Sequence, residues 1–142
     1  MSAVIRLAHT PAERQACIDV RMRVFVEEQG VPVGEEIDAQ DEEADHFLVD
    51  EDDTVVGTAR LVAVGAGVGK IGRVALLPEV RGRGIGRDLM WYVMGAGFRR
   101  FAELILDAQL TAIRFYERLG FEAEGPVFLD AGIEHRRMRC AR

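Results

Sequence analysis

Glycines and arginines alternate over residues 81–86, which read Arg-Gly-Arg-Gly-Ile-Gly. An apolar run of strand length, residues 71–77, precedes this turn, and apolar residues recur at helical spacing from position 89 onward. A strand, a glycine-rich turn and a helix together present free backbone N–H groups and the positive end of a helix dipole to an anion. Glycine permits a close approach of the backbone, and arginine adds charge-assisted hydrogen bonds. The pattern therefore predicts a pyrophosphate-binding turn.

Two other phosphate-binding motifs fit this turn less well. A P-loop requires a lysine followed by serine or threonine, and neither follows these glycines. A dinucleotide fingerprint has the spacing G-x-G-x-x-G directly after a strand, with an acidic residue roughly 20 positions later. Asp107 could be that acidic residue, but the glycines here are spaced G-x-G-x-G, and residues 78–81 separate them from the apolar run. A plain surface turn that caps the helix is the alternative without a function.

Composition places the chain among globular proteins. Its 142 residues, 49% apolar and 30% charged, predict one domain over residues 1–142. Cys17 and Cys140 give neither a disulfide framework nor metal-ligand spacing, so we predict no metal site and a cytoplasmic location. The start of the chain lacks the apolar core of a signal peptide, and no uncharged run could span a bilayer, which predicts no membrane association. A net charge of −6 argues against nucleic-acid binding.

The charges are unevenly distributed. Residues 24–59 contain 13 Asp or Glu and no Lys or Arg. One explanation is a solvated acidic loop that keeps the protein soluble. The other is a negative field that concentrates a cationic amine substrate. Arginines gather instead around the predicted anion site, at positions 73, 81, 83, 87, 99 and 100. An acidic front half and a basic turn suit an anionic cofactor that meets an amine.

The elements around the turn form a mixed sheet. We expect strands over 3–7, 46–49, 54–64, 71–77, 103–107, 121–129 and 134–141, and helices over 10–26, 84–100 and 110–119. Thr10, Pro11 and Glu13 give the first helix a capping box. Residues 27–45 are interpreted as a loop with at most one short helical turn.

The resulting order, β-α-β-β-β-α-β-α-β-β, indicates the α/β class with a mixed (α+β) sheet that is antiparallel at first and has a later parallel crossover. A dinucleotide-binding fold would place its glycines after the first strand, whereas here they follow the fourth. Edge strands near the C-terminus would suit a homodimer.

With this order of elements, the chain resembles the GNAT superfamily of acetyl-CoA-dependent N-acetyltransferases. Its first family element is Arg or Gln, two residues, Gly, one residue, then Gly or Ala, which Arg81, Gly84 and Gly86 match. The second runs from an asparagine position, here Gln109, through Ala112 and Phe115-Tyr116 to Gly120-Phe121. Segments 24–29, 44–47, 107–109 and 131–135 are similar to the bacterial ElaA-like branch of the family.

The resemblance implies acetyl-CoA as co-substrate and a set of cofactor-binding residues. Val74, Ala75 and Leu76 would pair their backbone with the pantetheine arm. The turn would hold the pyrophosphate through the backbone of Arg81, Gly82, Arg83, Gly84, Ile85 and Gly86. Gln109 and Phe115 would also contact the cofactor, although Gln109 replaces the usual asparagine. Tyr116 falls on the tyrosine that protonates the leaving thiolate, a proton that a phenol can supply at neutral pH.

The implied reaction is direct transfer of the acetyl group to a primary amine of a small molecule or a protein. A backbone N–H of the fourth strand would polarise the thioester carbonyl. Because aliphatic amines are mostly protonated at neutral pH, a base or a water chain must accept a proton. The candidate bases are Glu28, His46, Asp107 and His135.

Two other functions remain open. A catalytically silent sensor would bind acyl-CoA at the glycine-rich turn but would not catalyse acyl transfer. An acyl-homoserine-lactone synthase would share the fold and the sequence R-x-x-V-F at residues 21–25, which precedes an acidic stretch here too. The two cysteines have no adjacent base, so packing explains them better than an acyl-cysteine intermediate does.

Overall fold

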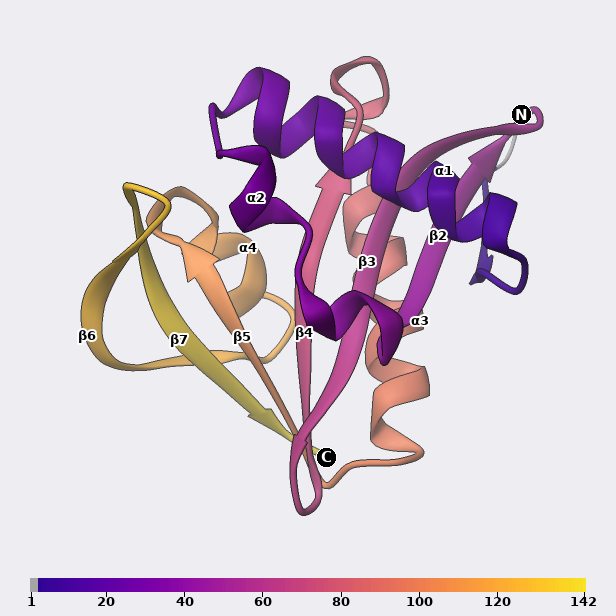
Figure 1. Ribbon diagram of the computed structural model, residues 1–142. Helices are drawn as coiled ribbons and strands as arrows, with labels where there is room; N and C mark the ends of the chain where they lie inside the picture. The colour runs from indigo at the N-terminus through magenta and orange to yellow at the C-terminus, as the bar shows by residue number, and fades with distance from the viewer. Residues whose placement is uncertain (1–2) are drawn as a thin grey trace.

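A seven-stranded mixed sheet runs through the molecule in the spatial order β1-β2-β3-β4-β5-β7-β6 (Figure 1). The computed structural model describes residues 3–142. The strands are β1 (Val4–Leu7), β2 (Asp45–Glu51), β3 (Thr54–Gly65), β4 (Val68–Leu76), β5 (Glu103–Gln109), β6 (Glu122–Asp130) and β7 (Ile133–Ala141). Neighbouring strands are antiparallel except β4 and β5, which are parallel. The predicted mixed sheet, the predicted order of strands and helices along the chain and the parallel crossover are confirmed.

Helices cover both faces of this sheet (Figure 1). They are α1 (Pro11–Arg21), the π-helical η1 (Met22–Glu28), α2 (Val33–Glu36), α3 (Ile85–Phe98), α4 (Ile113–Glu117), and the 3₁₀ turns η2 (Ala39–Glu42), η3 (Pro78–Val80) and η4 (Leu110–Ala112). α1 and α2 lie on one face of the sheet, and α3 and α4 lie on the other. Among residues 3–142, no helix has both the length and the apolar character needed to cross a membrane.

The first helix begins where its capping box predicts. The hydroxyl of Thr10 accepts the backbone N–H of Glu13 at 3.1 Å, and the Glu13 carboxylate accepts the backbone N–H of Thr10 at 3.2 Å. The helix does not end near residue 26, because η1 prolongs it to Glu28 through wider π turns. Gly30, with φ of 76°, follows and lets the chain leave the helix.

The main core lies between the sheet and α3. The helix buries one face, whose members are Ile85, Leu89, Met90, Val93, Met94 and Gly97. At Gly97 the helix comes so close to β5 that an added Cβ would lie 2.8 Å from the Leu104 side chain. This tight packing holds the two central strands, β4 and β5, against the helix that follows the glycine-rich turn.

β4 and β5 are paired only at their beginnings. Val68, Gly69 and Lys70 lie opposite Glu103, Leu104 and Ile105. β4 then continues to Leu76 and β5 to Gln109 with no further pairing between these two strands. The sheet therefore opens along its centre beyond Lys70, and the facing edge of β4 has no partner strand among the described residues.

A β-bulge lies in β4 just beyond the last paired residue. Arg60 of β3 is opposite Gly72 and Thr58 is opposite Ala75, so two residues of β4 face one residue of β3. The first of these two, Arg73, has φ of 53°, which is unusual for a residue other than glycine. Bulges bend a strand and increase its local twist, and this one occurs where β4 leaves β5.

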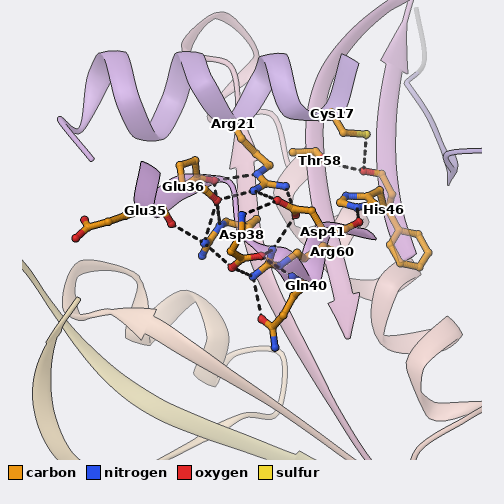
Figure 2. Close-up of polar contacts among 12 residues, drawn as sticks. Cys17, Arg21, Glu35, Glu36, Asp38, Gln40, Asp41, His46, Thr58 and Arg60 are labelled. Carbon is orange, nitrogen blue, oxygen red and sulfur yellow. Dashed lines mark hydrogen bonds and ion pairs between the residues drawn. The ribbon is translucent and has the colours of Figure 1, made fainter. Parts of the chain in front are cut away.

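The acidic segment 27–45 is more ordered than the sequence predicts, because it forms α2 and η2. Its carboxylates Glu36, Asp38 and Asp41 form ion pairs with arginines of α1, β3 and β4 (Figure 2). For these three groups, both the solvated loop and the free negative field are wrong. Their partners come from elements distant in the chain, which the local composition could not reveal.

Candidate active site

A cavity of about 480 Å³ lies where β4 and β5 separate. β4 lines it from Lys70 to Leu76, and β5 from Leu106 to Gln109. Phe115 and Tyr116 of α4 and His135 of β7 complete one side, while Gln29 and Glu35 belong to the other. The mixture of apolar walls and a few polar groups is typical of a small-molecule site.

The glycine-rich turn opens beside this cavity with its backbone donors unused. Gly84 caps α3 in the left-handed conformation with φ of 81°, and Gly82 has φ of 77°. Within the described chain, the backbone N–H groups of residues 82–87 donate to no backbone or side-chain acceptor. Gly86 lies against Leu76 of β4 and Phe115 of α4. The turn thus has the free N–H groups and helix start that suit a pyrophosphate.

The arginine side chains of the turn are already paired with carboxylates. Arg81 donates two hydrogen bonds of 2.7 Å to Glu28, and its Nε–H donates to the Leu76 carbonyl at 3.1 Å. Arg83 forms an ion pair with Glu51. The hydrogen bonds from Arg81 hold the pKa of Glu28 below its usual range. Glu28 is exposed and lies outside the cavity lining, so its geometry favours an ion pair over a base.

Tyr116 lies in the cavity wall among aromatic rings. Its ring meets Phe115 and Phe121 edge-to-face, with centroids 5.0 and 6.3 Å away. Burial raises the pKa of Tyr116 to about 12. Tyr116 lines the cavity, and its hydroxyl makes no hydrogen bond with any residue from 3 to 142. The phenol is therefore protonated at neutral pH and available to a ligand.

His135 lines the same cavity from β7, opposite Gln109 of β5. Its Nδ1 is 2.7 Å from the Ile133 carbonyl oxygen, and its ring stacks on Phe128 with centroids 5.9 Å apart. Because a carbonyl only accepts hydrogen bonds, Nδ1 carries the proton in the neutral ring, and Nε2 presents a lone pair. The fixed tautomer is what a general base requires.

Asp107 and His46, the other candidate bases, are differently placed. Asp107 lines the cavity between Lys70 at 2.9 Å and Arg137 at 2.5 Å. Burial would raise the pKa of Asp107, but the hydrogen bonds from Arg137 and Lys70 outweigh it and lower the pKa, which makes a weak base. His46 is buried on β2 away from the cavity lining, where its Nε2–H donates to the Asp41 carbonyl at 2.8 Å.

Gln109 joins the two sides of the opening. Its side-chain N–H donates to the side-chain oxygen of Gln29 at 2.9 Å, which connects the end of β5 to the end of η1. To contact the cofactor, Gln109 would have to break its hydrogen bond to Gln29 or donate its second side-chain N–H to the cofactor. No local pattern predicts this contact, because the two residues are 80 positions apart.

Two cavity residues are not among the predicted site residues. The sequence places Arg73 only in the basic region, and its positive φ follows no pattern in the sequence. No motif points to Lys70. No local signal could have found either residue, because their ion-pair partners, Glu36, Asp38 and Asp107, lie more than 30 positions away in the chain.

Comparisons with known proteins agree with this geometry. Residues 11–142 match the family described as the acetyltransferase (GNAT) domain. The chain is 36% identical to the uncharacterized N-acetyltransferase YjcF of Bacillus subtilis over 140 residues, 97% of this chain and 98% of the relative. The crystal structure of Escherichia coli ElaA superposes with a TM-score of 0.89 at 26% identity, covering 98% of this chain and 99% of the other.

A third comparison adds a ligand in another protein of the same fold. A GNAT family acetyltransferase from Elizabethkingia anophelis, solved with acetyl-CoA bound, has a TM-score of 0.76 at 16% identity and covers 99% of this chain and 98% of its own. Together with the expected similarity to ElaA, now confirmed, these matches extend over nearly the whole chain. The chain therefore belongs to the GNAT acetyltransferase family and is an acyltransferase.

Proposed function

We propose that this protein transfers the acetyl group of acetyl-CoA directly to a primary amine of a small molecule or a protein. The observation that carries the proposal is the opening between β4 and β5 beside a turn whose N–H groups lack acceptors. An extended arm can enter the opening while the turn binds its phosphates. The acetyl-CoA complex of the E. anophelis neighbour supports the choice of this co-substrate.

Each part of the site has a role in holding acetyl-CoA. The unpaired edge of β4 at Val74, Ala75 and Leu76 would pair with the amide groups of the pantetheine arm. The N–H groups of residues 82–87 would hold the pyrophosphate, and Arg81 and Arg83 could add charge after leaving their carboxylate partners. Phe115 and Gln109 line the same cavity and would contact the arm.

The reaction needs one proton acceptor and one proton donor. The neutral amine nitrogen attacks the thioester carbon, and a backbone N–H of β4 stabilises the oxygen on which negative charge develops. His135 Nε2 accepts the proton that the nitrogen loses, either directly or through water. As the C–S bond breaks, the Tyr116 hydroxyl donates its proton to the sulfur. No covalent enzyme intermediate is required.

We assign the base to His135 because it combines a cavity position with a free lone pair. Glu28 and Asp107 are carboxylates whose pKa values are lowered by cationic partners, and His46 faces the buried ion pairs. Glu35 and Asp130 are the carboxylates of the cavity lining that have no ion-pair partner among residues 3–142. They could favour an acceptor that carries positive charge.

Two measurements test the proposal. Titration calorimetry with acetyl-CoA should show binding, and release of the CoA thiol should be measured across a panel of primary amines. Absence of binding at high micromolar acetyl-CoA would refute the proposal. Binding without release of thiol for any amine would favour the acyl-CoA sensor instead, and a lactone product from an acyl donor with S-adenosylmethionine would favour the signal synthase.

A further inference from the structure

We infer that Arg73 is a positioning residue for acyl transfer, held by a closed ring of three arginines and three carboxylates. The inference rests on the proposed function. The ring contains Arg21 of α1, Arg60 of β3 and Arg73 of β4, which alternate with Glu36, Asp38 and Asp41. Figure 2 shows Arg21, Arg60 and the three carboxylates. Every arginine contacts two carboxylates, and every carboxylate contacts two arginines.

The ring is closed by short contacts throughout. In order around the ring they are Arg21–Glu36 2.9 Å, Glu36–Arg73 3.0 Å, Arg73–Asp38 3.3 Å, Asp38–Arg60 2.7 Å, Arg60–Asp41 2.8 Å and Asp41–Arg21 2.7 Å. Three positive and three negative charges balance, so the ring carries no net charge. Arg21 is fully buried and Glu36 is 3% exposed, which protects these pairs from solvent screening.

Arg73 connects this ring to the strand that faces the thioester. Its backbone is the first residue of the β4 bulge and has φ of 53°. Its guanidinium donates to the Glu36 carbonyl from Nε at 3.2 Å and from Nη2 at 3.1 Å, in addition to its two ion pairs. A side chain with this many fixed partners can hold a backbone conformation that arginine would otherwise avoid.

The ring affects the reaction through the position of the bulge in β4. Val74 is the second residue of the bulge and, with Ala75 and Leu76, forms the edge proposed to receive the pantetheine arm and to polarise the carbonyl. It also follows Lys70, the last residue of β4 that pairs with β5. Loss of the ring contacts would let this edge rotate, and small misplacements of reacting groups lower rates strongly.

A positioning role also explains why charged side chains, and not apolar ones, are buried in this place. A purely stabilising role could be filled by apolar residues of similar volume. A set of alternating charges instead fixes directions, because each guanidinium must meet its carboxylates in plane. Here the contacts fix the orientation of β4 relative to segment 33–42, which forms one wall of the cavity.

Four variants test the inference. Arg73→Gly removes the guanidinium while permitting the positive φ, Arg73→Lys retains the charge without the planar fork, and Asp38→Asn weakens the ring from the other side. Arg100→Ala is the matched control, since Arg100 does not lie at the predicted anion site: it follows the far end of α3 from the glycine-rich turn and pairs with Asp45 at 2.6 Å on the exposed surface. For each, kcat with the best amine, Kd for acetyl-CoA, the unfolding transition and amide hydrogen exchange of residues 71–77 are measured.

We expect Arg73→Gly to lower kcat about 10- to 100-fold while Kd for acetyl-CoA changes less than about threefold. Exchange should quicken within residues 71–77, and ethylguanidinium added to this variant should restore part of kcat. The kcat and exchange rates of Arg73→Lys and Asp38→Asn should lie between those of Arg73→Gly and the native protein. The values for Arg100→Ala should match those of the native protein.

Three results would overturn the inference. They are an unchanged kcat in folded Arg73→Gly, a loss of kcat matched by an equal loss of acetyl-CoA affinity, or unchanged exchange of residues 71–77. If Arg73→Gly does not fold, the same criteria apply to Arg73→Lys and Asp38→Asn. If the native protein transfers acetyl to no amine, the proposed function fails, and the exchange of residues 71–77 alone decides whether the ring positions the strand.

Discussion

Arg81 donates two hydrogen bonds of 2.7 Å to the carboxylate of Glu28, and this pair joins the end of η1 to the glycine-rich turn. Arg81 directly precedes the residues whose backbone N–H groups have no acceptor in the described chain. A phosphate and Glu28 would therefore compete for the same guanidinium. Glu28 thus has a defined role in the free protein that does not require proton transfer.

Glu28→Gln should tighten acetyl-CoA binding. The glutamine keeps a hydrogen-bond acceptor but loses the charge, so the guanidinium is released to a phosphate at lower cost. Because solvent screening makes exposed ion pairs weak, we expect Kd to fall only about two- to fivefold. Calorimetry at two salt concentrations would measure this, with Asp45→Asn as the control that removes one charge elsewhere. A loss of kcat beyond about 100-fold at unchanged Kd would instead make Glu28 the base.

Tyr116→Phe should lower kcat and leave binding nearly intact. The substitution removes the proton donor but keeps the aromatic contacts with Phe115 and Phe121, so we expect a loss of roughly 100-fold or more in kcat. Since the pKa of Tyr116 is raised to about 12, its ionisation should not limit the native rate below about pH 10. Thiol release from pH 6 to 10 measures both effects.

Tyr92→Phe is the control for that experiment. Tyr92 is an exposed tyrosine of α3 whose ring contacts Phe47, and it lies outside the cavity lining. It should retain native activity. Equal rates in Tyr116→Phe and the native protein would remove Tyr116 from the mechanism.

His135→Ala should slow acetyl transfer in a way that added imidazole reverses. Removal of the Nε2 lone pair should lower kcat by about 100-fold, and free imidazole can enter the space that the ring leaves. The rate is measured against imidazole concentration at constant pH. His9→Ala, at an exposed position before α1, should be neither slowed nor stimulated. An unaffected rate in His135→Ala would indicate that water accepts the proton.

The ion ring should make stability sensitive to acid. Burial would raise the pKa of Asp41, but hydrogen bonds from Arg21, the Asp38 backbone and Arg60 lower it well below its usual range; Arg60 likewise lowers the pKa of Asp38. Carboxylates with a depressed folded pKa stabilise the native state above their unfolded pKa, near 3.9, and this stabilisation is lost as pH falls further. Burial raises the pKa of Glu36, so the contribution of Glu36 to the free energy of unfolding changes with pH in the opposite direction.

We therefore expect the free energy of unfolding attributable to Asp38 and Asp41 to be constant above about pH 5 and to decline below about pH 4. Asp41→Asn should lower stability at neutral pH by about 3 kcal/mol, because it leaves buried arginines without a partner, and should flatten the decline. Urea unfolding from pH 3 to 7 measures this, with the exposed Asp45→Asn as comparison. An equally steep decline in Asp41→Asn would assign the acid sensitivity to other groups.

Elements whose signals are local can be predicted from the amino-acid sequence without the structure. The capping box of Thr10 and Glu13 marked the start of α1, the spacing of Leu89, Met90, Val93 and Met94 marked α3, and the glycines at 82, 84 and 86 marked a turn able to approach an anion. Hydrophobic periodicity, caps and glycines act within a few residues, so they are readable from a single chain. They were enough to predict the order of elements along the chain and the resemblance to the GNAT family, whereas the spatial order of the strands came from the tertiary structure.

Tertiary structure alone decided which charges meet. The partners of Glu36 and Asp38 come from α1, β3 and β4, and nothing in residues 27–45 indicates them. It also decided that Glu28 pairs with Arg81, that His46 is buried away from the cavity, and that Arg73 adopts positive φ at a bulge. Ion pairs form wherever the fold brings opposite charges together, and that distance depends on the packing of whole elements, which no local pattern records.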